Sequence, residues 1–326
     1  MSVRHTRNQH RSIDWQRMET LEERRLLSVN ISGDMLIVQG TPADDEILFF
    51  LSAGNKNTLV ISDNGQEHFY DVRQLAFDVN MVAIFGEAGA DLIKVDQRNG
   101  KIRLAFHMEG GLGEDTLQGA DGNDAFYGGD QMDTIFGMGG SDRLDGGDDD
   151  DYLNGGSGND YLYGRLGRDS LIGKSGNDLL FGDEDEDTLL GSAGNDYLDA
   201  GSDDDVVAGN GGRDTLRGGV GNDALDGGPA NDYIFGEDGK DTLLGGTHND
   251  QLFGGHGNDL LEGGVGNDSL DGGDATDTLF GNAGRDRFSI SAGSTRSEME
   301  DFGRGDSVGL FRDTSEVVRI AKKKTK

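Results

Sequence analysis

The polar and hydrophobic residues of the chain follow a nine-residue pattern from residue 110 to residue 290. An aspartate recurs at this spacing twenty times without insertion or deletion, and an apolar residue stands two positions after each one. A glycine stands four positions after each aspartate, except at Ala200 and Ile290. A fixed short period of this kind predicts a solenoid rather than a globular domain. The twenty aspartates are Asp115, Asp124, Asp133, Asp142, Asp151, Asp160, Asp169, Asp178, Asp187, Asp196, Asp205, Asp214, Asp223, Asp232, Asp241, Asp250, Asp259, Asp268, Asp277 and Asp286.

The pattern predicts an all-β fold, a parallel β-roll (a β-helix solenoid) of nonapeptide repeats. Each repeat divides into a six-residue loop that ends in aspartate and a three-residue strand whose middle, apolar residue points inward. Two repeats close one coil, so that residues 18 apart stack at about 4.8 Å, and ten coils make a rod of roughly 48 Å. The aspartates then form two columns. Edge one runs from Asp115 to Asp277 and edge two from Asp124 to Asp286.

Composition indicates what these columns bind. The chain carries a net charge of −33, and the segment between residues 28 and 317 holds 18 basic and 58 acidic residues. Such a charge repels nucleic acid and anionic membranes and attracts cations. The chain has no cysteine, which excludes disulfides and thiolate metal sites.

Stacked carboxylates predict a divalent cation between them. Like charges at about 5 Å cost about 3 kcal/mol per pair at an effective dielectric of 20. A divalent cation between the two carboxylates turns this repulsion into a net attraction. Calcium accepts carboxylate and carbonyl oxygens in irregular arrays, whereas magnesium demands octahedral geometry. The loop glycines allow a positive φ that turns carbonyls toward the ion. We therefore predict that all twenty aspartates are Ca²⁺ ligands; the nine gaps along each edge allow at most about 18 ions.

The chain has little hydrophobic material for its length. Hydrophobic residues make up 33% of it, which together with the high charge is typical of disordered proteins. One buried aliphatic per repeat is too little to offset the entropy of ordering the backbone. We expect the repeat region to be unfolded without metal and to fold on binding it.

Five loops, at residues 110–115, 155–160, 218–223, 254–259 and 263–268, have the sequence Gly-Gly-x-Gly-x-Asp in full. The chain thereby resembles the RTX (repeats-in-toxin) family of secreted proteins with hemolysin-type calcium-binding repeats. The resemblance implies that the loop aspartates and loop carbonyls bind ions shared between coils. It extends to Asp301-Phe302-Gly303-Arg304-Gly305-Asp306, which is similar to the C-terminal capping segment of the family.

The two edges match the motif unequally. Asparagine precedes the aspartate in seven of ten edge-two loops, but on edge one only at Asn222 and Asn258. On edge one the fourth-position glycine is replaced by Asp149, Asp185 and Asp203. Four basic residues in the loops should weaken nearby ions: Arg165, Arg168, Lys174 and Lys240. We predict that edge two binds calcium more uniformly; equal loss of bound calcium from Asp→Asn sets on the two edges would contradict this.

Residues 29–109 differ from the repeats and are β-rich. Apolar runs occur at 35–39, 46–51, 58–61 and 82–85, with turns at Asn64-Gly65 and Asn99-Gly100. The fragments 40–47 and 86–93 echo the repeat, and Asp91 lies 24 residues before Asp115. We interpret the segment as longer lead-in coils that cap the roll; a small independent β domain is the alternative. The predicted organisation is 1–28 basic segment, 29–109 cap, 110–290 roll, 291–316 C-terminal cap and 317–326 basic tail.

Export is expected from two resemblances. Residues 21–28, Leu-Glu-Glu-Arg-Arg-Leu-Leu-Ser, resemble the LEPR-XLL element of exported surface proteins, with Glu23 where proline is usual. A short charged helix is the alternative. The sequence has neither a secretory apolar run nor a transmembrane span. The RTX family implies a type I secretion signal, but none is recognisable. We expect a secreted or cell-surface protein.

Chemistry-bearing motifs other than the aspartates are lacking. The six histidines are scattered, and residues 29–109 are too few for a catalytic domain and contain no His-Glu-x-x-His. We expect no enzymatic activity and no cofactor besides Ca²⁺.

Aromatic residues gather on one predicted sheet face. They either stack across strands and stiffen the rod or contact a glycan or protein. The sheet after edge two carries Tyr127, Tyr161, Tyr163, Phe181, Tyr197, Tyr233, Phe235 and Phe253, and the other sheet Phe136, Tyr152 and Phe280.

The sequence thus predicts an exported calcium-binding β-roll with a structural or adhesive role at a surface. Two alternatives stay open. One is a calcium-folding or secretion module of an RTX-type toxin or hydrolase system, in which neighbouring genes or partners would supply catalysis. The other is a disordered acidic calcium buffer, in which metal would induce no β structure.

Overall fold

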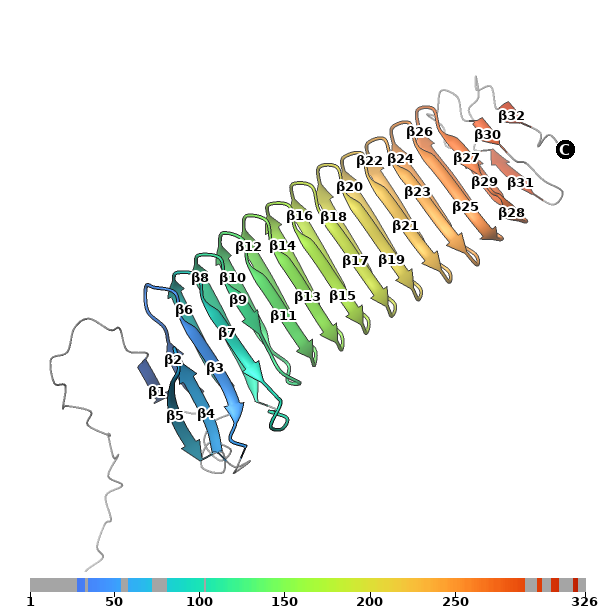
Figure 1. The fold of residues 1–326 in the computed structure, drawn as a ribbon. Coiled ribbons are helices and arrows are strands. Elements are labelled where there is room, and N and C mark those ends of the chain that lie inside the picture. Colours follow the sequence, from blue (N-terminus) through green and yellow to red (C-terminus); the bar gives the residue numbers. More distant parts are fainter. Residues whose placement is uncertain are drawn as a thin grey trace, which may run out of the picture.

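The structure is a computed structural model that describes residues 28–32, 35–53, 58–71, 81–102, 104–290, 298–300, 306–310 and 319–321. Every element in these ranges is a β-strand, and the strands form a solenoid of about ten turns behind an N-terminal strand cap (Figure 1). The predicted all-β solenoid is confirmed. The LEPR-XLL-like segment before Ser28, residues 301–305 of the capping similarity, and most of the basic tail lie outside the described residues.

The first sheet, sheet A, follows edge two of the roll. All neighbours in it pair in parallel except β1 and β2, which are antiparallel. Its order is β1 (Ser28–Ser32), β2 (Met35–Gln39), β6 (Met81–Ala88), β8 (Ala105–Leu112), β10 (Ala125–Asp130), β12 (Arg143–Asp148), β14 (Tyr161–Leu166), β16 (Leu179–Glu184), β18 (Tyr197–Ser202), β20 (Thr215–Val220), β22 (Tyr233–Asp238), β24 (Gln251–His256), β26 (Ser269–Asp274), β29 (Arg287–Ile290) and β31 (Ser307–Leu310).

The second sheet, sheet B, follows edge one. It begins with two antiparallel pairs, β5 with β4 and β4 with β3, and continues in parallel. Its order is β5 (Gln66–Asp71), β4 (Thr58–Asp63), β3 (Glu46–Leu51), β7 (Leu92–Asp96), β9 (Thr116–Gln118), β11 (Thr134–Gly139), β13 (Tyr152–Ser157), β15 (Ser170–Ser175), β17 (Thr188–Ala193), β19 (Val206–Gly211), β21 (Ala224–Pro229), β23 (Thr242–Thr247), β25 (Leu260–Gly266), β27 (Thr278–Phe280) with β28 (Ala283–Gly284), β30 (Glu298–Glu300) and β32 (Arg319–Ala321).

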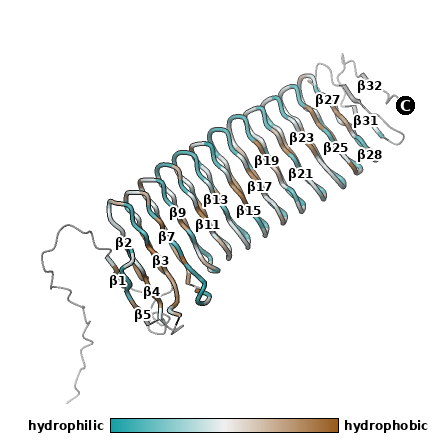
Figure 2. Tube along the Cα trace, in the orientation of Figure 1, coloured by the Kyte–Doolittle hydropathy of each residue, from teal (hydrophilic) through white to brown (hydrophobic). Residues whose placement is uncertain are grey.

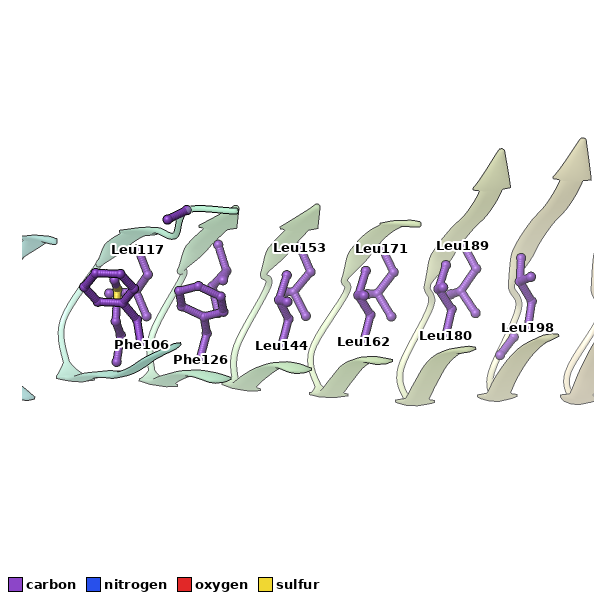
Figure 3. Close-up of a cluster of buried hydrophobic side chains, with 14 of the residues drawn as sticks. Phe106, Leu117, Phe126, Leu144, Leu153, Leu162, Leu171, Leu180, Leu189 and Leu198 are labelled. Carbon is purple, nitrogen blue, oxygen red and sulfur yellow. The ribbon is translucent and has the colours of Figure 1, made fainter. Parts of the chain in front are cut away.

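The predicted register between coils is confirmed. Phe126 pairs with Leu144, and Leu144 with Leu162, so that residues 18 apart stack along the rod. The apolar residue of each repeat is buried between the two sheets, where the leucines form two facing rows (Figure 3). Turns at the strand ends are mostly hydrophilic, and a hydrophobic stripe crosses the strands (Figure 2). Most strands of the roll contribute one such residue, so the core consists of two facing rows of single side chains.

The repeat strands are longer than predicted. Most span six residues rather than three. The alternation of buried and solvent-facing positions continues past the apolar residue into the first two positions of the next loop motif. The first glycine of each motif therefore points inward and is buried, as at Gly155 and Gly164. Our expectation that the glycines as a group serve a positive φ was wrong for this position. Its φ lies outside the left-handed region, and glycine is favoured there because a Cβ would come too close to the loop aspartate; Ala200 is the one position of this kind before Asp286 that carries a Cβ.

The N-terminal segment continues both sheets, as predicted for lead-in coils. Glu46 of β3 pairs with Leu92 of β7, and Leu92 pairs with Thr116 of β9, a step of 24 residues. The predicted strands at 35–39, 46–51, 58–61 and 82–85 all form, and Asn64-Gly65 is the turn of the β4–β5 hairpin. Strands β2, β3, β6, β7 and β8 each bury at least two apolar side chains, whereas most strands of the roll proper bury one, and β18 buries Leu198 and the small Ala200.

Candidate metal centres

All twenty repeat aspartates are buried, with at most 4% of their surface exposed. They form two columns joined by hydrogen bonds along the rod. In each column the backbone N–H of one aspartate donates to Oδ1 of the aspartate 18 residues later, at 2.7 to 3.1 Å. Each carboxylate thus binds the coil before it, so that the aspartates hold the coils in register.

Both columns of aspartates extend beyond the residues that follow the nine-residue spacing. Asp45 donates its N–H to Asp91, and Asp91 donates to Asp115, both at 2.7 Å. At the other end of the roll, Asp286 donates to Asp306 at 3.0 Å. The echo fragments 40–47 and 86–93 therefore belong to the edge-one column. Sequence reasoning found these fragments but did not count their aspartates among the site residues, since the nine-residue spacing is lost there.

The second carboxylate oxygen, Oδ2, is buried in most of these residues and accepts no hydrogen bond from the described part of the protein. An ionised carboxylate in this position is destabilising unless a cation or a proton compensates it. The residues are Asp91, Asp115, Asp133, Asp142, Asp151, Asp160, Asp169, Asp178, Asp187, Asp196, Asp205, Asp214, Asp223, Asp232, Asp241, Asp250, Asp259 and Asp268. Asp124 differs, because the N–H of Ala120 donates to its Oδ2 at 3.1 Å.

In many of these loops a backbone carbonyl oxygen from the next coil lies near Oδ2. A Cβ atom on Gly137 would lie 2.5 Å from Asp142 Oδ2 and 2.5 Å from the carbonyl oxygen of Gly155. A Cβ on Gly245 would lie 2.8 Å from Asp250 Oδ2 and 2.6 Å from the carbonyl oxygen of Gly263. At these two loops the missing side chain of the first glycine therefore lets a carboxylate oxygen and a carbonyl oxygen approach the same position. Oxygen-only donor sets suit hard cations, and calcium in particular accepts mixed carboxylate and carbonyl ligands.

Burial raises the pKa of most of the repeat aspartates, and the hydrogen bond to Oδ1 only partly opposes it. Burial is the largest cause, with repulsion from neighbouring aspartates as a smaller one in most of them. The pKa is raised to about 8 for Asp133, Asp142, Asp151 and Asp187. It is raised to about 7 for Asp169, Asp178, Asp205, Asp214, Asp241 and Asp250. In the metal-free fold many of these groups therefore bind protons near neutral pH.

Side chains alone do not form a metal cage. Within the described ranges, no three His, Asp or Glu side chains converge to hold an ion. Any cation in the columns must therefore take most of its ligands from backbone carbonyls and share carboxylates between coils. The structure brings the predicted aspartates together as columns, not as clusters. The same part of the chain also contains no helix long and apolar enough to cross a membrane.

The second and fourth positions of the loops are the ones that need a positive φ. Asp149, Asp185 and Asp203, which replace the fourth-position glycine, have φ of 79°, 72° and 83°, as predicted. The second position also adopts a positive φ where it is not glycine, as at Lys174 (79°) and Arg165 (96°). The sequence pattern alone did not separate these two positions from the first.

Lys174→Gly is expected to stabilise the roll. A non-glycine residue in the left-handed region costs about 1–2 kcal/mol, and the lost chain entropy of glycine offsets part of this. The net gain of about 1 kcal/mol should raise the melting temperature of the calcium-loaded protein by about 2–4 °C.

Arg165→Gly is the matched control. It relieves similar strain but removes the hydrogen bonds of the guanidinium to Asp145 at 2.8 and 2.9 Å. A melting temperature raised equally by both substitutions would contradict this account.

Asparagine in the loops has a role that sequence analysis missed. On edge two the N–H of the residue before a column aspartate donates to the side-chain oxygen of its counterpart 18 residues earlier wherever that counterpart is asparagine or serine. Asn177 donates to Asn159 at 2.8 Å, and Asn195 donates to Asn177 at 2.7 Å. This second ladder explains why asparagine recurs there. It uses a neutral oxygen, which adds no charge beside the aspartate column.

Two loop arginines have different partners. Arg165 lies over the outer face of sheet A, where it bonds Asp145, so its charge is directed away from the edge-one column. Arg168 stays in the loop and lies 3.3 Å from Asp150 of the preceding coil. The predicted weakening of nearby ions therefore applies to Arg168 more than to Arg165. It stays a prediction, as does the difference between the two edges.

Comparison with known families assigns the repeats. The family model of the RTX calcium-binding nonapeptide repeat matches residues 107–135, 127–162, 163–198, 199–234, 226–261 and 253–288. These ranges cover more than half of the chain. The chain belongs to the RTX family. No curated protein matches it. The RTX repeats bind Ca²⁺, and in this chain they form a β-roll with a ladder of aspartates. Within the residues that the structure describes, RTX repeats and the β-roll are what is found.

Proposed function

We propose that this RTX protein is exported and that its roll folds on binding Ca²⁺, to serve as a structural or adhesive element at a surface. One observation carries the proposal: in the two columns of buried carboxylates, eighteen Oδ2 atoms, from Asp91 to Asp268, accept no hydrogen bond from the described residues. In the absence of cations, ordering the roll at neutral pH requires either burying negative charge or taking up protons. Calcium removes that penalty, so that folding and binding are coupled.

The column aspartates and the carbonyls of the first glycines are the groups that would hold the ions. We assign the Ca²⁺ ligands to the twenty predicted aspartates and add Asp91, whose Oδ2 is in the same situation. Asp124 is the weakest candidate because Ala120 already donates to its Oδ2. Calcium in this role supplies charge compensation and cross-links between coils. The ceiling of about 18 ions follows from the spacing of the repeats.

The difference in free calcium between the cytosol and the cell exterior indicates where the roll would fold. Extracellular calcium modules bind with dissociation constants of about 10⁻⁴–10⁻³ M, far above the free calcium of a cytosol. A roll of this affinity would stay unfolded inside the cell and fold once outside. RTX repeats are typical of secreted proteins, which agrees with this order of events.

Small-angle X-ray scattering on the full chain tests the proposal. In chelator at pH 8 the radius of gyration should be about 50–60 Å, as for a mostly unfolded chain of this length, and calcium should reduce it to roughly half. Magnesium at the same concentration is the control and should change it little. A compact rod in chelator, or equal compaction by magnesium, would overturn the proposal.

The aromatic face of sheet A supports a structural role. Tyr163 stacks on Phe181 in the next coil, with ring centroids 5.1 Å apart and planes at 11°. In the preceding coil, the guanidinium of Arg143 lies 4.2 Å from the centroid of the same ring. Phe235 and Phe253 stack in the same way, at 4.9 Å and 7°. A sugar stacks on an open ring face, and these faces are covered by their neighbours. The contacts therefore favour stiffening of the rod over glycan binding.

Tyr163→Thr should destabilise the calcium-loaded roll by about 1–2 kcal/mol, since it removes a stacked ring pair and a cation–π contact. Tyr161 is the matched control. It points outward from the same strand and is 46% exposed, so Tyr161→Thr should have a much smaller effect on thermal unfolding. Unchanged stability in Tyr163→Thr, together with lost attachment of the protein to cells, would instead favour a contact face.

A further inference from the structure

We propose that the N-terminal coils, residues 35–126, fold without calcium and act as the template on which the repeats fold as they bind it. The proposal rests on the calcium-coupled folding proposed above and adds where that folding begins. It is carried by three observations: the first carboxylate of each column is already satisfied by protein donors, the N-terminal core is thicker, and the hydrogen bonds of the columns have a direction.

The edge-one column starts at a carboxylate that needs no cation. Asp45 Oδ2 accepts the N–H of Thr41 at 2.7 Å and the Thr41 hydroxyl at 3.1 Å. Its Oδ1 accepts Nδ2 of Asn64 at 3.1 Å. Asn64 also accepts the N–H of Glu46 at 3.0 Å and lies at the turn of the β4–β5 hairpin. In the rest of the column, Oδ1 accepts an N–H from the preceding coil. At Asp45, the first aspartate of the column in the described residues, the hairpin places the amide of Asn64 in that position, which closes the column.

The edge-two column also starts with both oxygens bonded. Asp124 Oδ1 accepts the N–H of Phe106 at 2.9 Å, and its Oδ2 accepts the N–H of Ala120 at 3.1 Å. Ala120 occupies the second loop position, but it lacks the positive φ found at that position in the other repeats. This difference turns its N–H toward the carboxylate. The donor that most other loops lack is supplied here by the local backbone.

The core is thicker in these coils. Strand β3 buries Ile47, Phe49 and Leu51, and β8 buries Phe106 and Met108. The ring of Phe49 packs edge-on against that of Phe106 at 5.7 Å. Each buried aliphatic or aromatic side chain contributes about 1.5–3 kcal/mol. Of the four column carboxylates in this part, Asp45 and Asp124 have a donor to Oδ2, while Asp91 and Asp115 lack one in the described residues. With two or three buried side chains per strand as well, this part depends less on ions than the repeats do.

The columns grow in one direction from this template. Every column carboxylate after the first accepts an N–H from the preceding coil, so a new coil finds its donor only where that coil is already ordered. The template offers two such donors to the coils beyond it, the N–H of Asp115 to Asp133 and the N–H of Asp124 to Asp142. Each added coil then offers the donors for the next. Folding should therefore run from the N-terminal coils toward residue 290.

Hydrogen exchange of the full chain at pH 8, followed by mass spectrometry, tests the proposal. In chelator, peptides from β2, β3, β6 and β8 should stay at least tenfold better protected than peptides from 133–286. Calcium should then protect the repeats, with those nearest the template protected at the lowest concentration. Protection of all coils only with calcium would overturn the template and leave calcium-coupled folding intact. Full protection of all coils in chelator would overturn both.

The double variant Thr41→Val, Asn64→Gly removes the two side-chain donors to Asp45, leaves the backbone N–H of residue 41 in place, and keeps a residue suited to the turn. It should lower protection of the N-terminal coils in chelator and raise the calcium midpoint for the repeats severalfold. Asn99→Gly, in the other predicted turn, is the matched control and should change neither. An unchanged calcium midpoint in the double variant would overturn the role of this closure.

Discussion

In chelator, lowering the pH from 8 to about 5 is expected to order much of the repeat region that is unfolded at pH 8. Aspartate has a pKa near 3.8 when unfolded, and in the metal-free fold burial raises it to about 6 for Asp115 and Asp124, about 7 for Asp178 and about 8 for Asp133. Between these values the folded state binds more protons than the unfolded state. The free energy of unfolding therefore falls as pH rises between these pKa values. Lowering the pH protonates the buried carboxylates and restores the stability of the metal-free roll.

Calcium and protons thus compete for the same oxygens. Calcium affinity should fall as the pH is lowered from 8 to 5, and binding at pH 7 should release protons. Far-UV circular dichroism in chelator across this range measures the first effect, with light scattering as a control for aggregation near the isoelectric point of about 4.3. A metal-free roll whose β-structure grows as pH rises would contradict the burial of these carboxylates.

Replacing column aspartates with asparagine is expected to convert part of the roll from calcium-dependent to calcium-independent. In Asp142→Asn, Asp160→Asn and Asp178→Asn, the side-chain Oδ1 can still accept the N–H of the preceding coil, as the aspartates do. The new amide places a donor where Oδ2 lies beside a carbonyl of the next coil, as Gly155 is for Asp142. Each site then loses a buried charge and gains a donor, worth about 1–3 kcal/mol at pH 8.

The triple asparagine variant should bind fewer ions, yet keep more β-structure in chelator than the unchanged protein. The same positions changed to alanine should bind fewer ions and be less stable in every condition, because both oxygens are lost. Asp130, Asp226 and Asp238 are exposed, and their triple asparagine variant serves as the control. If the asparagine and alanine sets at the column positions are equally destabilised in chelator, the role assigned to Oδ2 is wrong.

The fold could be predicted from the sequence because two nonapeptides form one coil, so that the repeat length fixes which residues pair between coils. The spacing of Leu144 and Leu162 gives both the period of the core and the pairing of β12 with β14. The turn at Asn64 and the strands around it were also predicted. The columns followed from the spacing of the aspartates, and the extension through Asp45 and Asp91 was visible as an echo of the motif.

The chemistry inside the columns could not be read from spacing. Whether a carboxylate oxygen is satisfied depends on where individual N–H groups point. Asp124 and Asp142 occupy equivalent positions, but only Asp124 has the extra donor from Ala120. Likewise, the first and second glycines of a motif are identical residues, yet one fills a tight space and the other adopts a positive φ. Such differences arise from local backbone geometry rather than from residue type.

The central claim, that calcium compensates the buried carboxylates, is tested most directly by measuring bound calcium and β-structure together. Equilibrium dialysis and far-UV circular dichroism of the full chain at pH 8 give the two quantities over one calcium titration. The account predicts that β-structure rises in step with bound ions, that binding saturates at no more than about 18 ions, and that magnesium does not substitute. Full β-structure before any calcium is bound would contradict it.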